Sequence, residues 1–217
     1  MSQIAFDATS YATGTSSPVN ITHTNTGLNR ILIVFIYLKN ALNNPTVTGV
    51  TYNGVAMTQA ALRTSANDAH YSYVLVNPTS GANTVAVSFT QNAGTTTAYC
   101  YALSYTGARQ NSQPDASTQG NNGGTSNTLT TTITTVTNNC WVIGFSPNYA
   151  QSATSSSSGI TNRNSSNNWI LAGDSNSNVS PAGNYSMTHT VSGTADVYWN
   201  MVSLAPATEA AFLFNIT

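Results

Sequence analysis

The fold of this 217-residue chain is decided by one stretch, Ile31-Leu32-Ile33-Val34-Phe35-Ile36-Tyr37-Leu38. Every position in it is apolar, so both of the faces that a β-strand presents are apolar. A strand with one face in water alternates apolar and polar residues, whereas a strand covered on both faces does not. We therefore expect residues 30–39 to form a central strand that other parts of the protein cover on each side.

Short β-rich runs separated by Asn, Gly, Ser and Pro recur on either side of this stretch, and no segment has the apolar spacing of a helix. The pair Asn53-Gly54 predicts a hairpin with a type I′ turn, because both central residues of that turn need positive φ angles. We predict strands near residues 4–11, 18–25, 30–39, 46–52, 55–63, 69–76, 83–90, 96–105, 127–136, 140–146, 168–173, 184–191 and 196–204. The predicted fold is all-β, a single β-sandwich of the jelly-roll or Ig-like kind with about 12 antiparallel strands.

We expect one domain over residues 1–206, because all-β sandwiches of this length commonly form a single unit. The low-complexity stretches Gln110–Asn127 and Gln151–Asn168 are too polar to pack, so we interpret both as surface loops or displayed edges. Residues 207–217 form an apolar C-terminal tail that includes Phe212, Leu213 and Phe214. This tail is expected either to add a strand to its own sheet or to dock on a neighbouring chain by strand addition.

Residues Thr97–Tyr105 alternate between large and small side chains. The small ones suit close contact between two sheets. The large ones, which include Tyr99, Tyr101 and Tyr105, are expected to form a ladder over the opposite surface or a contact with another subunit. We therefore take these three tyrosines and the tail as candidate partner or oligomer contacts.

Charged residues make up only 5% of the chain, where about 25% is usual for a soluble protein. The net charge of -1 gives little repulsion between copies, which favours close association. Nucleic-acid binding needs clusters of basic residues. The basic residues here are instead scattered singly, at Arg30, Lys39, Arg63, Arg109 and Arg163. We expect no nucleic-acid partner.

Residues Met1–Asp7 have neither the basic nor the apolar region of a secretion signal, and the longest apolar stretch is too short to span a bilayer. We therefore expect synthesis in a cytoplasm and no membrane insertion. Cys100 and Cys140 each lie in an apolar strand and could pair, although two buried thiols fit a reducing compartment better.

Nothing in the sequence marks a catalytic or metal site. The three histidines, His23, His70 and His189, lie in polar strands and not in distinctive turns. The acids are isolated from one another, and neither zinc nor calcium spacing occurs. Asp174, between Gly173 and Ser175, is interpreted as a turn residue. We expect a protein without enzymatic activity, cofactor or metal.

Glycan binding is the alternative function, because sugar sites on β-sandwiches use exposed aromatic side chains. Trp141 and Trp199 lie in apolar strands and are expected to pack in the core or against a subunit. Trp169 follows a polar loop and is the best candidate platform, although packing in the core is the competing interpretation.

Five motifs occur in order along the chain: Asn29-Arg30-Ile31-Leu32-Ile33-Val34, Val50-Thr51-Tyr52-Asn53-Gly54-Val55-Ala56-Met57, Tyr73-Val74-Leu75-Val76-Asn77-Pro78 with Ser80-Gly81, Ala102-Leu103-Ser104-Tyr105-Thr106-Gly107, and Val202-Ser203-Leu204-Ala205-Pro206. The ordered set resembles a family of β-sandwich domains found in tailed-phage structural proteins and in bacterial surface or secreted proteins. The chain has Asn53 where that family usually has Gly.

The resemblance implies a phage virion component, a capsid decoration (cement) protein or a fibre, that stabilises or displays a particle surface. Its implied partners are other virion proteins of the capsid or tail and copies of itself, with a host surface glycan as a further candidate. The implied location is the virion, after synthesis in the host cytoplasm.

Overall fold

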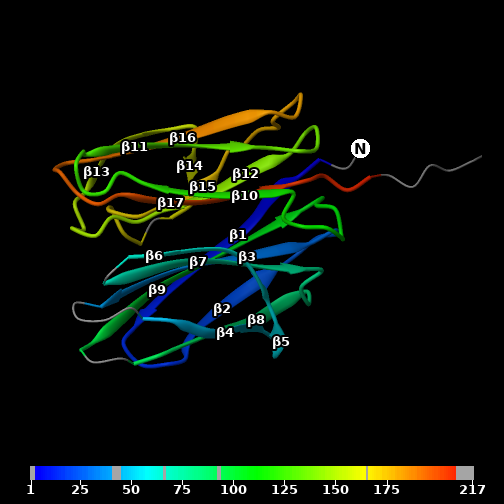
Figure 1. Cartoon of the computed structure of the whole chain (residues 1–217). Helices are drawn as coiled ribbons and strands as arrows, with labels where there is room; N and C mark the ends of the chain where they lie inside the picture. The colour runs from blue at the N-terminus through cyan, green and yellow to red at the C-terminus, as the bar shows by residue number, and fades with distance from the viewer. Residues whose placement is uncertain (1–2, 41–44, 66, 92–93, 165, 209–217) are drawn as a thin grey trace, which may run out of the picture.

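The computed structural model describes residues 3–40, 45–65, 67–91, 94–164 and 166–208. Within these ranges the chain forms no helix, so none is long and apolar enough to cross a membrane. It forms seventeen strands, all paired antiparallel, in four sheets stacked one above another (Figure 1). The prediction of an all-β antiparallel fold is confirmed.

The first half of the chain forms the two lower sheets of Figure 1. The outer N-terminal sheet has the strand order β2 (Val19–Asn25), β8 (Gly81–Phe89), β4 (Val47–Tyr52), β5 (Val55–Ala56). The inner N-terminal sheet has the order β1 (Ala5–Gly14), β9 (Thr96–Thr106), β3 (Ile31–Asn40), β7 (Asp68–Val76), β6 (Thr58–Thr64).

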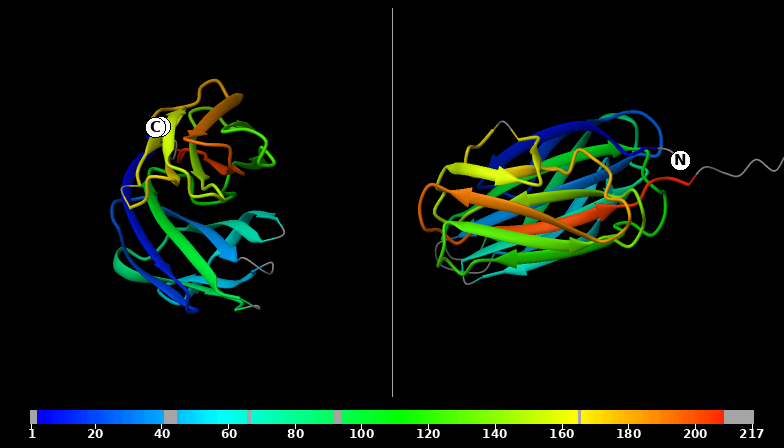
Figure 2. Two further views of the ribbon diagram at one scale, coloured as in Figure 1. Left: turned by 90° about the vertical axis from the view of Figure 1, so that its left-hand side faces the viewer. Right: turned by 90° about the horizontal axis from the view of Figure 1, so that it is seen from above.

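The second half of the chain forms the two upper sheets. The inner C-terminal sheet has the order β10 (Ala116–Asn121), β17 (Tyr198–Leu204), β12 (Trp141–Ser146), β15 (Leu171–Asp174), β14 (Thr161–Asn162). The outer C-terminal sheet has the order β11 (Thr128–Thr134), β16 (Asn184–Val191), β13 (Thr154–Ser158). Figure 2 shows the two halves end-on and from above.

Strand β3 is covered on both faces, as its sequence predicts. Its even-numbered residues from Leu32 to Leu38 belong to a hydrophobic cluster between the two N-terminal sheets. Its odd-numbered residues from Ile31 to Tyr37 belong to a second cluster, between the inner N-terminal and inner C-terminal sheets. A third cluster, which includes Met187 and Trp199, lies between the two C-terminal sheets. Three apolar layers therefore hold the four sheets together.

The prediction of a single sandwich with about 12 strands is wrong. The chain forms two sandwiches, one from residues 5–106 and one from residues 116–204, stacked through their inner sheets. Strands β12 and β17 are fully buried like β3, because they too are covered on both faces. Sequence shows that a strand is buried on both faces, but it does not show how many sheets are stacked.

The two low-complexity stretches, which we interpret as surface loops or displayed edges, each contain both, since short edge strands alternate in them with loop segments. The first contains β10, and the second contains β13 and β14. Each of the three lies at the edge of its sheet. An edge strand has one neighbour, and its backbone hydrogen bonds to that neighbour do not require apolar side chains.

Two further predictions are confirmed. Asn53 and Gly54 have φ angles of 50° and 76°, and they join β4 to β5 with Tyr52 opposite Val55. Cys100 and Cys140 are both free thiols and both buried. The prediction of one domain over residues 1–206 stays a prediction.

Replacement of Gly144 by Ala is expected to destabilise the C-terminal sandwich. A Cβ atom at this position would lie 2.5 Å from Met187 Sδ and 2.7 Å from Trp199 Cζ3, so neighbouring side chains would have to move. We expect a loss of about 1–3 kcal/mol in the free energy of unfolding, measured by urea titration. Gly49→Ala is the matched control, because nothing lies within 4 Å of a Cβ there. Equal effects of the two changes would contradict this account.

Candidate functional site

The tyrosine ladder of β9 lies inside the chain. Tyr101 and Tyr105 are completely buried between the two sandwiches, and Tyr99 is half-buried at the margin of the same interface. Tyr101 packs on Phe145 with ring centroids 5.5 Å apart, and Tyr105 packs edge-on against Trp141. The expected subunit contact through Tyr101 and Tyr105 is therefore wrong, because the second half of the same chain covers them.

Trp169 is also part of this interface. It is 8% exposed and makes edge-to-face contacts with Tyr99 and Tyr37, at centroid distances of 5.0 and 6.1 Å. Its expected role as an exposed glycan platform is wrong, and packing in the core is what the structure shows. Phe212, Leu213 and Phe214, the other candidate contacts, lie outside the described residues.

A cluster of polar side chains lies at one rim of the interface. His70 of β7 is completely buried between the rings of Tyr37 and Tyr198, with centroid distances of 4.7 and 4.0 Å. Its Nε2 lies 3.4 Å from Oδ1 of the buried Asp68. Burial lowers the pKa of His70, so the imidazole is neutral at pH 7. Asp68 and His70 are two residues apart on one strand, which is the sequence signal that could have revealed this pair.

A cavity of about 250 Å³ opens beside this cluster. Ser65 and Asn67 line it from the turn between β6 and β7, in the N-terminal sandwich. Tyr149, Asp196 and Tyr198 line it from the C-terminal sandwich. The cavity therefore exists only where the two halves of the chain meet, and no local motif marks it.

A second ionic group lies at the opposite rim. The guanidinium of Arg163 donates two hydrogen bonds of 3.0 Å to the buried carboxylate of Asp174. Tyr105 donates to the same carboxylate, and the guanidinium lies 4.4 Å from the ring centroid of Phe6 in β1. Asp174 ends β15 and accepts a hydrogen bond of 3.0 Å from the backbone N–H of Asn176, so its interpretation as a turn residue is confirmed, and through Tyr105 it also contacts the other sandwich.

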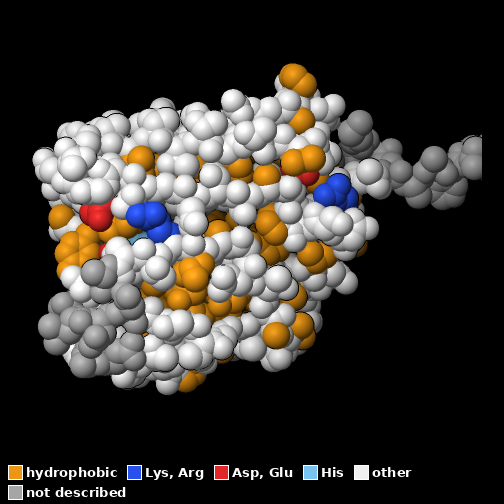
Figure 3. Space-filling view, viewed as in Figure 1, with side chains coloured by type: hydrophobic (Ala, Val, Ile, Leu, Met, Phe, Trp, Pro, Cys, Tyr) orange, Lys and Arg blue, Asp and Glu red, His pale blue; other side chains and the backbone are white. Residues whose placement is uncertain are grey.

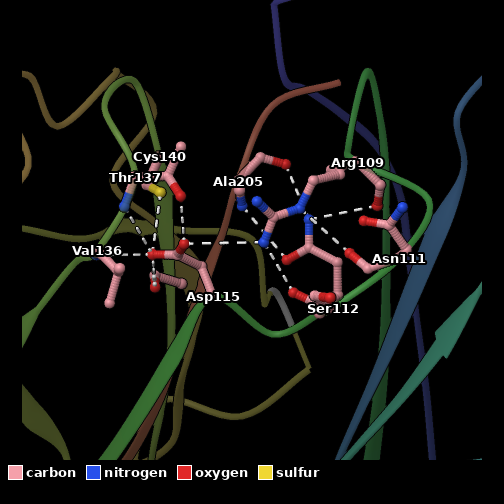
Figure 4. A network of polar contacts seen from close by, with 10 residues as sticks. Arg109, Asn111, Ser112, Asp115, Val136, Thr137, Cys140 and Ala205 are labelled. Atoms are coloured by element: carbon pink, nitrogen blue, oxygen red, sulfur yellow. Dashed lines mark hydrogen bonds and ion pairs between the residues drawn. The ribbon is translucent and has the colours of Figure 1, made fainter. Parts of the chain in front are cut away.

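A third group of polar contacts, around Arg109 and Asp115, holds the segment that connects the two sandwiches (Figure 4). Arg109 donates from its side chain to the carbonyls of Asn111 and Ser112, and its backbone N–H donates to Ala205. Its Nη2 lies 4.0 Å from the carboxylate of Asp115. These contacts hold the connecting segment against the end of β17.

Asp115 also accepts hydrogen bonds from Val136, Thr137 and the thiol of Cys140 (Figure 4). Burial, together with the negative charge of Asp115, raises the pKa of Cys140 to about 12. Burial alone raises the pKa of Cys100. Both cysteines are therefore thiols at neutral pH, and the thiolate is the form that attacks substrates or binds metals.

A serine–histidine pair is present that the sequence did not reveal. The hydroxyl of Ser146 lies 2.8 Å from Nδ1 of His189, and Thr154 Oγ1 lies 2.9 Å from Nε2. The Ser146 hydroxyl donates to the carbonyl of Tyr198, so it accepts from the imidazole and does not donate to it. Ser146 and His189 are completely buried. This geometry holds strands together and does not activate a nucleophile, which needs its own proton directed at the base.

The outward face of the outer C-terminal sheet is an array of hydroxyl groups. Strands β11 and β16 place four cross-strand side-chain pairs on it, each joined by a hydrogen bond of 2.7–2.9 Å: Thr128–Thr190, Thr130–Thr188, Thr132–Ser186 and Thr134–Asn184. None of these side chains is charged. The other face of the same strands carries Ile133 and Met187, which are buried.

Among the described residues, no three His, Cys, Asp or Glu side chains are grouped as metal ligands would be. Comparison of the chain with protein-family models, with curated proteins and with solved structures gave no match. The function is therefore argued from the geometry above together with the sequence.

The stacked rings of Phe35 and Phe145 lie at the centre of the interface between the sandwiches, 5.2 Å apart and nearly parallel. We expect Phe145→Ala to lower the free energy of unfolding by about 3–5 kcal/mol, because it leaves a cavity in a fully buried layer. Leu28→Ala is the control, since Leu28 is 80% exposed and its loss is expected to change stability by less than about 0.5 kcal/mol. Urea titration measures both, and a Phe145→Ala effect as small as that of the control would refute the importance of this layer.

The protein is expected to lose stability between neutral pH and about pH 4. Burial lowers the pKa of His23, against the opposing charge of Asp7, and the pKa of His189, in both cases from 6.5 to about 4. As the pH falls below 6.5, the unfolded chain binds protons at these side chains and the folded chain does not. Each histidine then removes up to about 3 kcal/mol of stability by pH 4.

Urea titrations at several pH values between 7 and 4 measure this loss. His189→Asn is the test variant, because its side chain does not titrate and its pH dependence should therefore be smaller. The same decline in both proteins would show that His189 makes no contribution. The carboxylates of Asp7, Asp68 and Asp115 add to the loss only below about pH 5, because the unfolded chain takes up protons at these groups near pH 3.8 and the folded chain, in which their pKa values are lowered, does not.

Proposed function

We propose that this protein is a non-enzymatic structural protein of a phage virion, a capsid decoration or fibre component that stabilises or displays the particle surface. The observation that carries the proposal is the outward face of the outer C-terminal sheet, with its four hydrogen-bonded pairs of uncharged side chains. Such a face is polar enough to stay in water, and it carries no charge that would repel a neighbouring copy.

The internal use of reactive side chains supports a structural role. The imidazole of His189 joins two strands, and the thiol of Cys140 is hydrogen-bonded to Asp115. The ion pair of Arg163 and Asp174 lies within the C-terminal sandwich, and it reaches the N-terminal sandwich through the hydrogen bond from Tyr105 and the ring of Phe6. The chain thus uses its ionic groups to hold the four sheets together, which suits a protein whose task is to keep its shape.

The arrangement of the four sheets supports the same role. Three apolar layers join them into a rigid stack, and the edge strands of the stack expose backbone groups that can pair with another chain. Copies that bind a particle at many points would each add buried area, so their effects on the stability of the particle would accumulate. The proposed partners are capsid or tail proteins and copies of this chain, and the proposed location is the virion.

One candidate contact surface is the band between the two sandwiches. Strands β6 and β10, the edge strands of the two inner sheets, lie side by side there. On the face shown in Figure 3 hydrophobic side chains gather in this band, and charged side chains form one small group toward each end of it. Leu62 of β6 is 37% exposed. An apolar band between two strand edges suits the addition of a strand from a partner.

The apolar tail is the proposed source of such a strand from the chain itself, and its removal is a direct test. We expect the full chain to form oligomers in solution and a chain truncated after Thr208 to be monomeric, as measured by light scattering. The triple variant Phe212→Ser, Leu213→Ser, Phe214→Ser should behave like the truncated chain, and Val136→Ser, at a side chain that is 73% exposed, is the matched control. A full chain that stays monomeric at all concentrations would contradict self-association.

The proposed location in the virion is tested separately from the oligomeric state. Peptides of this chain should be found by mass spectrometry in purified virions, and electron microscopy should show the four-sheet stack on the capsid or tail. Absence of the chain from intact particles would overturn the proposed function, whatever the oligomeric state in solution.

A further inference from the structure

The cavity of about 250 Å³ at the rim of the interface has features that the proposed virion role does not use. It is lined by Ser65 and Asn67 from the N-terminal sandwich and by Tyr149, Asp196 and Tyr198 from the C-terminal sandwich. Because the two sandwiches are packed through a large buried layer, the two sides of the cavity are held at a fixed distance from each other. A preformed hollow with a few converging polar groups and aromatic walls is the usual form of a small-molecule site.

The charges around the cavity balance. Lys39 and Arg63 are positive, Asp68 and Asp196 are negative, and His70 is neutral because it is buried. These four ions are more than a third of the eleven charged residues of the whole chain, so they are concentrated here. A site with no net charge favours a neutral ligand over an anion or a metal ion.

The lining offers both hydrogen-bond acceptors and donors. The carboxylate of Asp196 is oriented by the hydroxyl of Tyr198, at 2.6 Å, and by the amide of Asn121, at 3.3 Å. An ionised carboxylate has lone pairs for further donors. The side-chain amide of Asn67 can both donate and accept.

Behind the lining lie buried polar atoms whose hydrogen bonding is incomplete. Both ring nitrogens of His70, Oδ2 of Asp68 and the hydroxyl of Tyr37 have no hydrogen-bond partner among the described residues. All three side chains are completely buried or nearly so. The ring of His70 stacks on Tyr198, and Asp68 accepts a hydrogen bond from Ser65, so this cluster is in direct contact with the lining. These atoms are closed off from the cavity, so the hydrogen-bonding groups offered to an occupant are those of the lining itself.

The ring of Tyr149 forms an aromatic wall. It is held in place by Lys39, whose ammonium donates to the Tyr149 carbonyl at 2.9 Å and lies 4.8 Å from the ring centroid. Tyr149 also donates from its backbone N–H to the carbonyl of Asp196. The backbone segments that carry Tyr149 and Asp196 are therefore fixed relative to each other.

From these features we propose that the cavity binds a neutral sugar, one residue of a glycan. A neutral sugar has hydroxyl groups that donate to Asp196 and accept from Asn67, and it has an apolar C–H face that packs on Tyr149. It carries no charge to be repelled by either Asp196 or Lys39. The volume of the cavity accommodates a single small ring, so the rest of a glycan would extend into solvent. The proposal does not depend on the virion role.

Saturation-transfer NMR with the full chain tests this site, using free glucose, galactose, mannose, rhamnose and N-acetylglucosamine as probes at millimolar concentrations. We expect signal transfer to at least one of them, and a titration gives its Kd. Asn67→Ala and Tyr149→Ala should each weaken that binding by about tenfold, the effect of losing one hydrogen bond or one aromatic contact.

Asn111→Ala is the matched control, because Asn111 is an exposed asparagine that lines a different cavity of about 220 Å³. It should leave the Kd unchanged, and equal thermal unfolding midpoints would show that all three variants are folded. Three results would each overturn the proposal: no transfer to any of the sugars, binding that Asn67→Ala and Tyr149→Ala leave unaltered, or binding of inorganic phosphate at the same residues. None of these results bears on whether the chain is found in virions, so the two proposals fail independently.

Discussion

The contact between the two inner sheets is the interaction on which the rest of this structure depends. Strand β3 has apolar side chains on both faces, and only one of these faces can be covered by the outer N-terminal sheet. The other face, with Phe35 at its centre, would be exposed to water if the C-terminal half of the chain were absent. Since exposure of a large apolar face is costly, the two sandwiches must stay together. This requirement fixes the four-layer stack, and it also fixes the position of every polar group at the rims.

Ionic side chains lie in small groups at both rims of this contact. At one rim the ion pair of Arg163 and Asp174 contacts Tyr105 and Phe6 of the other sandwich, while Asp68 and His70 lie under the cavity at the opposite rim. The segment around Arg109 ties the connection between the sandwiches to the end of β17. Buried ions of this kind contribute little net stability once desolvation is counted, but breaking one pair is costly. The hydrogen bond that Tyr105 donates to Asp174 crosses the interface and ties one of these groups to the other sandwich.

The exterior of the protein reflects the small number of charged residues in the chain. With so few ionic groups, most of them engaged inside or at the rims, the outward strands remain in water by means of hydroxyl and amide groups, as in the paired threonines of β11 and β16. An exterior of this kind permits close association of copies, which is the basis of the proposed virion role. Because charges are rare on this exterior, the balanced group of charges around Asp196 is distinctive. The neutral sugar proposed as its ligand carries no charge that this group would repel.

The sequence by itself determined the all-β class, the double coverage of β3 and the turn at Asn53-Gly54. These are local properties, because the residues at a position and next to it specify strand periodicity, φ angles and burial. The number of sheets and the burial of Trp169 and of Tyr101 were decided only by the tertiary structure. Each depends on which apolar face meets which, and the sequence pattern of a face buried in its own chain is the same as that of a face buried against a partner. For this reason the tyrosine ladder could be read as a subunit contact, and the cavity at Asn67 and Asp196, which two distant segments form together, could not be read at all.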